Sequence, residues 1–427
     1  MMQAPACGGP SPLKKTWKGK KHMKRIISLM LVLALLLCGC GTREEGSPST
    51  SAQQAETTAA VTTEATTEAT TEATTVPTEP EVFRNPLNGE ILDAPFTDRI
   101  FANTVSNLQE NLPHVGVVDA DMIIETYVSM NNVIRCLALF TDIESVEAIG
   151  STRSTRPIFN DIAQHYDLIV SHAGGSSTAL NDARNRGIDN FNIDSWAVAE
   201  SGASYRDTVY KRAYENTLFG VGAGIKAYAE SQGIPMELEK DYGFDFTENG
   251  TPADGEDADR IAINMVYQRA QKETVMLYDH ATGKYVWNQY GKAMQDQITG
   301  EYEAFTNVLI MHANITNNGI YHAADFVAGG TGYYANGGKL IPIVWTCADE
   351  DSAFEFMTTD AEPLELGVGN TYICIISTDS TVTYEDVEPV PVETEPAETV
   401  ETAAEETAAE TISVTIPAEL PEEDCLG

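Results

Sequence analysis

The chain has 427 residues and a formal net charge of −38. This acidity argues against nucleic acid as a partner, because neutralising phosphates requires clustered lysine and arginine side chains. It also argues against a protein that lies flat on an anionic membrane surface.

The first predicted element is an export signal. Met23 opens a segment in which Lys24 and Arg25 precede an apolar run over residues 26–37. A basic start followed by about a dozen apolar residues is typical of a signal peptide, and the run is short for a membrane span. We therefore expect residues 1–39 to be a signal peptide, with Met23 as the true start.

The apolar run ends in a sequence that resembles the lipobox of bacterial lipoproteins. Leu37 stands at position −3 and the small Gly39 at position −1 before Cys40. The resemblance implies cleavage before Cys40 and a lipid on its sulfur, which would anchor the protein to the cell membrane on its extracytoplasmic side. The alternatives are an uncleaved anchor helix and a secreted protein.

Acidic low-complexity segments flank the central region. Residues 40–82 form a Thr/Glu-rich linker, and residues 379–427 form a tail with no Lys or Arg. Neither segment has the apolar surface to offset ordering entropy, so both are expected to be disordered. The folded part should comprise an N-terminal domain over 83–240 and a C-terminal domain over 258–378.

The N-terminal half is predicted to be an α/β layer with a mixed sheet. Two β-rich runs flank Asn131-Asn132, which favours a hairpin. Strands and helices then alternate, which is typical of an α/β layer. The expected strands are 122–128, 134–140, 146–150 and 168–171, and the expected helices are 157–166 and 178–186.

The C-terminal half is predicted to be mostly β. From about residue 261, short strands alternate with glycine-containing turns, and the last strand is expected at 372–376. Cys136, Cys347 and Cys374 lie in apolar runs and favour buried positions, although a Cys347–Cys374 disulfide stays open. The Cys and His spacings typical of zinc sites are absent from the sequence, and we expect no metal or cofactor.

The segment 150–157 is the first candidate site. Pro157 suits the first position of a helix, and Ser154 or Thr155 could cap the free N–H groups there. Arg153 and Arg156 would then lie at the positive end of a helix, where two cations call for a compensating anion. The anion could be an external ligand, or the protein's own carboxylates on Glu125, Asp161 or Asp167.

The turn 172–177 is the second candidate site, because it also follows a strand and precedes a helix. If strands 146–149 and 168–171 were parallel, both turns would meet at one sheet edge. His172 could serve there as a base and Ser176 as a donor or nucleophile, while Gly174 and Gly175 would permit close backbone approach. The sequence offers no recognisable acid to orient His172, so catalysis is the less favoured interpretation.

A third cluster combines glycine-rich turns with aromatic residues. Gly329-Gly330-Thr331-Gly332-Tyr333-Tyr334 precedes Lys339 and Trp345. Such aromatics can stack on sugar rings, but more often they pack against a sheet.

Several of these motifs resemble the YerB-like bacterial lipoproteins, which carry a two-part domain of unknown function numbered 3048. The resemblance implies a lipobox, an envelope location and a layered α/β sandwich, and it implies no established activity. The family usually has a histidine near Tyr214–Phe219, where this chain has none. The matching motifs are Asn85–Gly89, Ala120–Glu125, Ile149–Pro157, Ser171–Ser176, Gly330–Lys339 and Pro342–Trp345.

Together these features favour a non-enzymatic lipoprotein of the cell envelope. Its anionic or glycan-like ligand, such as a cell-wall component, would bind between segments 150–157 and 172–177. The alternative is a hydrolase that acts on an envelope component through His172 and Ser176.

Overall fold

The computed structural model describes residues 82–210 and 212–387. The expected signal peptide, Cys40 and nearly all of the linker lie outside these residues, as does most of the acidic tail. No helix in the described part of the chain is long and apolar enough to cross a membrane.

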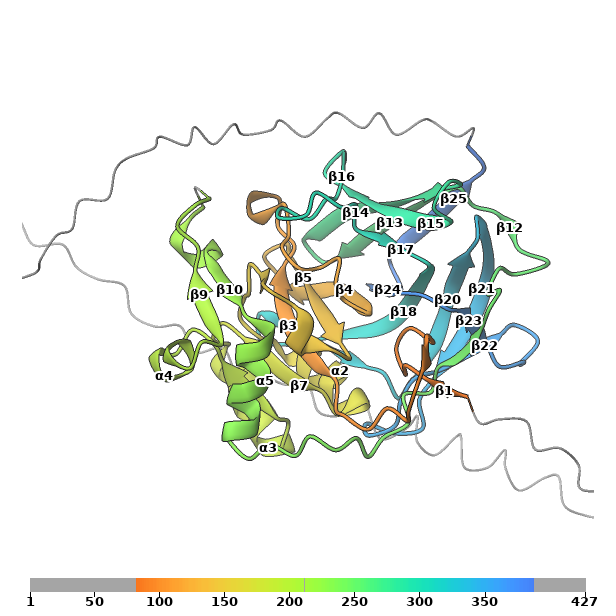
Figure 1. The fold of residues 1–427 in the computed structure, drawn as a ribbon. Coiled ribbons are helices and arrows are strands. Elements are labelled where there is room, and N and C mark those ends of the chain that lie inside the picture. Colours follow the sequence, from red (N-terminus) through yellow and green to blue (C-terminus); the bar gives the residue numbers. More distant parts are fainter. Residues whose placement is uncertain (1–81, 211, 388–427) are drawn as a thin grey trace, which may run out of the picture. The chain divides into compact units, whose positions relative to one another are not determined.

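A twelve-stranded mixed sheet is the largest element of the fold (Figure 1). It takes strands from both halves of the sequence. In spatial order its strands are β12 (Glu256–Asp257), β21 (Lys339–Thr346) with β22 (Glu355–Thr358) beside it, β20 (Gly330–Asn336), β18 (Asn307–Asn318), then both β19 (Tyr321–Asp325) and β24 (Thr371–Ser377), which pair with different parts of β18, and next β4 (Met122–Ser129), β5 (Val133–Phe140), β3 (Phe101–Ser106), β7 (Ile169–His172) and β8 (Asn190–Asn192).

Strand β24 joins the two halves of the large sheet. It runs parallel to β18 on one side and to β4 on the other, so that Cys374 lies between Ile310 and Glu125. All seven residues of β24 are buried, which fits the nearly continuous apolar sequence typical of a central parallel strand. The boundary expected between residues 240 and 258 therefore separates sequence segments that share one sheet.

The N-terminal half contains the predicted hairpin, since β4 and β5 pair antiparallel. Strand β3 pairs with β5 and runs parallel to β7. Strands 146–149 and 168–171 do not pair with each other, so the condition for a shared sheet edge is not met. Instead, β6 (Ile149–Gly150) pairs antiparallel with β10 (Leu218–Gly220), which also pairs with β9 (Ser204–Arg206). Strand pairing depends on distant partners, which the local pattern does not specify.

Four α-helices occur in the described residues, all in the N-terminal half. The first two match the predicted helices: α2 begins at Pro157, and α3 ends before Gly187, whose positive φ of 72° suits glycine. Most of α2 is buried, including Ile158, Ile162 and His165. The helices are α2 (Pro157–Tyr166), α3 (Ser177–Arg186), α4 (Trp196–Glu200) and α5 (Gly222–Ser231), and the 3-10 helices are η2 (Gln109–Asn111), η3 (Ile143–Ser145) and η4 (Tyr214–Asn216).

A six-stranded sheet packs against the large sheet (Figure 1). Its strands are β16 (Lys292–Ala293), β15 (Lys284–Gln289), β14 (Ala270–Asp279), β13 (Arg260–Tyr267) and β25 (Thr381–Glu385), with β17 (Ala304–Phe305) beside β15. Two small sheets complete the fold, β1 (Phe83–Arg84) with β2 (Ile91–Leu92) and β11 (Asp245–Thr247) with β23 (Glu365–Gly367). One hydrophobic core runs through both large sheets.

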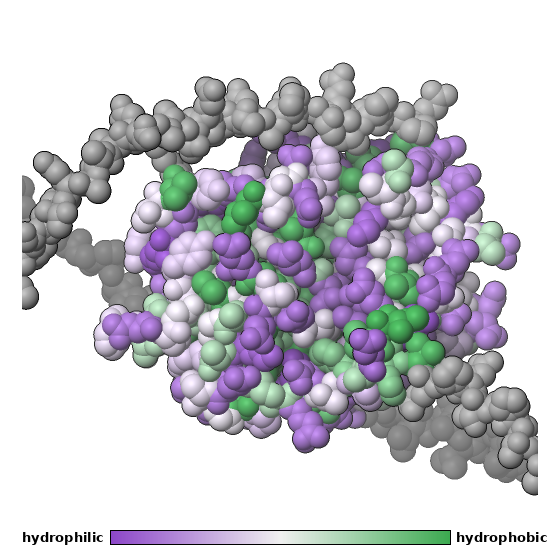
Figure 2. All heavy atoms as spheres, viewed as in Figure 1, coloured by the Kyte–Doolittle hydropathy of each residue, from purple (hydrophilic) through white to green (hydrophobic). Residues whose placement is uncertain are grey.

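The fold as a whole is mostly β, so the expected α/β sandwich describes only the region around α2 and α3. Strand β25 also lies beyond residue 378, where we expected the folded part to end. Val382 and Tyr384 alternate along β25 and pack against the core, which explains why this acidic stretch is ordered. On the face shown in Figure 2, hydrophilic residues predominate and hydrophobic ones are scattered among them.

Candidate functional site

The two candidate segments lie against each other. The Ala173 amide donates to the Arg153 carbonyl oxygen over 2.9 Å, and the Thr155 amide donates to the Gly174 carbonyl oxygen over 3.0 Å. Thr155 and Gly175 form an isolated parallel bridge. The structure thus brings segments 150–157 and 172–177 together, although not through the strand pairing that we expected.

The start of helix α2 has no side-chain cap. Pro157 is its first residue, as predicted, but Arg156 occupies the N-cap position, with φ −140° and ψ 161°. The expected cap from Ser154 or Thr155 is wrong, because both residues lie before the N-cap. A guanidinium cannot accept a hydrogen bond from the helix, so the first turn has no side-chain cap. Pro157 has no N–H, and the Phe159 amide donates to the Arg156 carbonyl oxygen over 3.0 Å.

A third arginine, which we did not single out from the sequence, extends this site. Arg135 lies on β5 and is 5% exposed. Its Nη1 donates to the Ser154 carbonyl oxygen, and its Nε has no hydrogen-bond partner. The sequence carries a signal that could have identified Arg135, because it is the one charged residue within the apolar run of β5. We call the guanidinium groups of Arg135, Arg153 and Arg156 the arginine site.

The other two arginines are held by neutral groups. Arg153 Nη1 donates to the Glu215 carbonyl oxygen over 2.9 Å and also to the Asn216 side chain. Arg156 Nη1 donates to the Thr155 carbonyl oxygen over 2.7 Å, and its guanidinium lies 4.9 Å from the ring centroid of Tyr321. The buried Nε of Arg156 also has no partner. Each group therefore keeps N–H donors for another ligand.

The protein's own carboxylates do not pair with the arginine site. All three candidates bind another cation: Glu125 binds Lys272, Asp161 binds Arg186 over 2.7 Å, and Asp167 binds Arg99 over 3.0 Å. Among the described residues, no salt bridge reaches Arg135, Arg153 or Arg156. The expected internal pairing is therefore wrong for these three carboxylates.

The positive charge of the arginine site is uncompensated. Burial lowers the pKa of Arg135 well below its usual value, and the charges of Arg156 and Arg153 lower that pKa further. Burial also lowers the pKa of Arg153, while nearby Glu215 and Glu110 oppose this shift without forming a salt bridge. An anion between the guanidinium groups would relieve both effects.

His172 and Ser176 do not form a catalytic pair. His172 is 1% exposed and its Nε2 lies 3.0 Å from Asn190 Oδ1. Burial lowers the pKa of His172. Ser176 caps helix α3, because its Oγ accepts from the Ala179 amide over 3.1 Å. No hydrogen bond joins His172 to Ser176 in the part of the chain that the structure describes.

The two glycines of segment 172–177 have distinct surroundings. Gly174 has a positive φ of 68° and open space where a Cβ would stand, and its amide donates to Asn192 Oδ1 over 2.8 Å. A Cβ on Gly175 would meet the Leu180 side chain at 2.9 Å. Gly174 therefore supplies a turn, and Gly175 permits close packing on α3.

Two of the three aromatic residues of the third cluster are not available for stacking, whereas Tyr333 is partly exposed beside His312 and Tyr384. Tyr334 and Trp345 are fully buried in the large sheet. Lys339 pairs with Asp257 over 2.6 Å. Cys347 and Cys374 are both free and buried, so the disulfide that the sequence left open is not formed.

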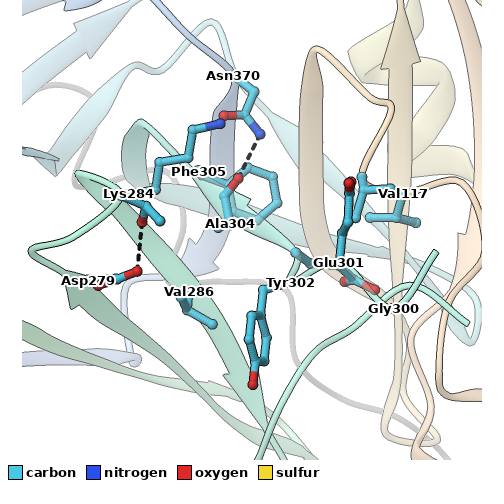
Figure 3. A pocket seen from close by; sticks show the side chains of 13 residues that line it. Val117, Asp279, Lys284, Val286, Gly300, Glu301, Tyr302, Ala304, Phe305 and Asn370 are labelled. Atoms are coloured by element: carbon cyan, nitrogen blue, oxygen red, sulfur yellow. Dashed lines mark hydrogen bonds between the residues drawn. The ribbon is translucent and has the colours of Figure 1, made fainter. Parts of the chain in front are cut away.

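A cavity of about 480 Å³ lies elsewhere, beside the six-stranded sheet (Figure 3). Asn370, whose side chain donates to the Ala304 carbonyl oxygen over 2.8 Å, stands at one side, and Tyr302 and Val286 line another. The lining includes three acidic side chains, Asp279, Glu301 and Glu303, together with Lys284, and no residue of the arginine site. The cavity therefore has charges of both signs in its lining, whereas the arginine site gathers three guanidinium groups of one sign.

Comparisons with known proteins identify the family of the chain. The family model described as "Protein of unknown function (DUF3048) N-terminal domain" matches residues 87–235, and the corresponding C-terminal domain model matches residues 263–373. The Bacillus subtilis (strain 168) protein named "Putative lipoprotein YerB" is 23% identical over 273 residues, covering 63% of this chain and 80% of that protein.

A solved structure shows the same fold. The crystal structure of YerB from Bacillus subtilis superposes with a TM-score of 0.58 at 22% identity, covering 70% of this chain and 99% of the YerB chain. The two family models together span more than half of the sequence. The chain therefore belongs to the DUF3048 family of YerB-like proteins.

Proposed function

We propose that this protein is a lipid-anchored, extracytoplasmic lipoprotein whose globular region binds an anionic ligand at the arginine site. The observation that carries the proposal is the absence of any salt bridge from Arg135, Arg153 and Arg156 within the described residues, in a chain whose net charge is −38. With so many carboxylates available, three unpaired guanidinium groups point to an external anion.

The geometry suits a phosphate or carboxylate. Guanidinium groups bind these anions through paired, charge-assisted hydrogen bonds, which are about twice as strong as neutral ones. The start of α2, which no side chain caps, adds the positive end of a ten-residue helix. Arg135 Nε is buried and unpartnered, so it retains a donor that only a bound group could satisfy.

The setting supports an envelope ligand such as a cell-wall fragment. Cys40 follows a lipobox-like sequence, and the similar Bacillus subtilis protein carries the name of a lipoprotein. A tethered domain would meet anionic polymers and their fragments outside the membrane. The hydrolase alternative gains no support, because Ser176 serves as a helix cap and His172 lacks an orienting acid.

Titration of the mature chain with inorganic phosphate and with cell-wall fragments tests the proposal. We expect binding by calorimetry that weakens at least about tenfold in Arg153→Ala and in Arg156→Ala, since each loses a charge-assisted contact. Arg184→Ala is the matched control, because Arg184 is exposed and contacts only Asn181 on its own helix. Equal binding by all variants would exclude this site.

A further inference from the structure

An exposed aromatic ring lies beside the arginine site. The 3-10 helix η4 carries Tyr214, which is 72% exposed, and Arg153 binds the two residues that follow it. Arg153 donates to the Glu215 carbonyl oxygen and to the Asn216 side chain. Tyr214 and the arginine site therefore belong to one continuous surface.

Arg206, which is not part of the arginine site, covers one face of the Tyr214 ring. The guanidinium of Arg206 lies 3.9 Å from the ring centroid, a cation–π contact. Arg206 is itself fixed by Asp194 at 2.5 Å, by the Tyr214 carbonyl oxygen at 2.7 Å and by Thr217 Oγ1 at 3.3 Å. The ring is thus held in place from one side, and its opposite face meets solvent.

We infer that the ligand of the arginine site is an acidic saccharide, with its sugar ring on the free face of Tyr214 and its phosphate or carboxylate on the guanidinium groups. This inference rests on the proposed function. A fixed aromatic face offers an apolar, flat contact without the entropy cost of ordering a mobile side chain. A cationic occupant is disfavoured, because Arg206 lies against the ring and Arg153 binds the two residues that follow Tyr214.

The arrangement also separates two tasks. Arg135 and Arg156 are largely buried and recognise charge, whereas Tyr214 is exposed and can recognise the body of the ligand. Removing Tyr214 should therefore abolish the preference for a sugar without abolishing binding of the anion. Removing an arginine should weaken both.

The experiment compares four probes on the mature chain: inorganic phosphate, N-acetylglucosamine, its 6-phosphate, and the carboxylate-bearing N-acetylmuramic acid. We expect an acidic saccharide to bind about three- to tenfold more tightly than phosphate, the range of one aromatic contact. Tyr214→Ala should remove that preference and Tyr214→Trp should retain it. A preference for the 6-phosphate or for N-acetylmuramic acid identifies which acidic group the site takes.

Trp196→Ala is the matched control, since Trp196 is 75% exposed and, among the described residues, forms no cation–π contact with an arginine. Phosphate and saccharides that bind equally well overturn the inference while leaving the proposed function intact. So does a sugar preference that persists in Tyr214→Ala. If neither phosphate nor any acidic saccharide binds, the proposed function itself fails, and this inference fails with it.

Discussion

Arg135 shows how a residue that weakens the fold can serve a ligand. It is buried at a strand position facing Thr126 and Ser106, and its charge has no counter-ion among the described residues. A desolvated charge without a partner costs several kcal/mol even after relaxation. Its hydrogen bond to the Ser154 carbonyl oxygen offsets only part of this cost, about 1.5–3 kcal/mol.

Replacing Arg135 by Met should therefore stabilise the protein and abolish anion binding. We expect the free energy of unfolding to rise by about 1–2 kcal/mol in urea titrations without phosphate. Arg184→Met, on the exposed face of α3, should change it by less than about 0.5 kcal/mol. A destabilised Arg135→Met variant that still binds phosphate would show that Arg135 is a structural residue.

His172 gives the stability of the protein a pH dependence. Burial lowers its pKa below the ordinary value of about 6.5, so the unfolded chain binds a proton that the folded chain rejects. The stabilisation is complete above pH about 6.5 and is lost as the pH falls below it. We expect the free energy of unfolding to decrease between pH 7.5 and pH 5.5, by at most about 1.4 kcal/mol per pH unit for this one group.

Urea titrations at several pH values measure this effect. His172→Gln should flatten the pH dependence relative to the unmodified chain, and the comparison cancels the contribution of every other titrating group. His165, His312 and His322, whose pKa values are also lowered by burial, should maintain part of the slope. An unchanged slope in His172→Gln would contradict the assignment.

The arginines illustrate how far the sequence predicts individual residues. Arg153 and Arg156 were recognisable because they stand beside Pro157, a local signal of a helix start. Arg135 was not, because its proximity to them depends on β5 lying two strands from β7 in the folded sheet. The carboxylate partners were also mispredicted, since ion pairing follows tertiary contacts that the spacing of charges does not reveal.

At the scale of elements, a buried ion pair connects the two large sheets. Glu125 of β4 binds Lys272 of β14, and it also accepts hydrogen bonds from Asn107, Thr274 and Tyr372. The Glu125 side chain is fully buried, and every acceptor position of its carboxylate is occupied by a hydrogen bond. Such a network fixes how the sheets face each other, because each group loses its partner if one sheet slides.

Disrupting half of this pair should cost more than removing all of it. Glu125→Gln should lower the free energy of unfolding by about 3–5 kcal/mol, because Lys272 is left buried and unpaired. Adding Lys272→Met should recover a large part of that loss. The exposed pair Arg260–Glu385 is the matched control, and its removal should cost less than about 1 kcal/mol. Additive effects at Glu125 and Lys272 would contradict the coupling.

Elements specified by neighbouring residues were predicted well, and pairings between strands distant in the sequence were not. Helices α2 and α3 were predicted closely, because a proline start and a glycine end are local features. The β4–β5 hairpin was also predicted from a local feature, since Asn131-Asn132 lies between two β-rich runs. The pairing of β6 with β10 was missed, because nearly seventy residues separate these strands. The local sequence of one strand does not specify which distant strand pairs with it.

At the scale of the whole molecule, β24 makes the two family domains one folding unit. It lies between β18 and β4 and supplies buried residues to the core shared by both halves. The sequence does not predict that β24 lies between β18 and β4, because a run of apolar residues with high β propensity fits any central strand. The sequence division at residues 240–258 therefore says little about which parts unfold together.

Unfolding of the chain in urea should occur in a single transition for both halves. Far-UV circular dichroism and tryptophan fluorescence, reported in part by Trp287 and Trp345, should give coincident curves. A fragment that ends at residue 257 should fail to fold, since β4 loses its neighbour on one side. Two separated transitions, or a folded fragment, would contradict the shared sheet.

The proposed anchor has its own test at this scale. Cys40→Ala should move the protein from the membrane fraction to the soluble or secreted fraction, or leave it as an uncleaved precursor, because lipidation needs the thiol. Mass spectrometry of the mature N-terminus measures the modification directly. A mature chain that starts at a residue other than Cys40 would contradict the proposed processing.

The position of β24 near the end of the described residues also sets the order in which the large sheet can be completed. Strand β4 ends at Ser129, but its neighbour begins at Thr371, so at roughly 5–20 residues per second on the order of tens of seconds of synthesis separate them. During that interval β4 presents an unpaired apolar edge, which is prone to pair with other chains. The large sheet can be completed only after β24 has been synthesised, so its closure follows the synthesis of nearly all of the described residues.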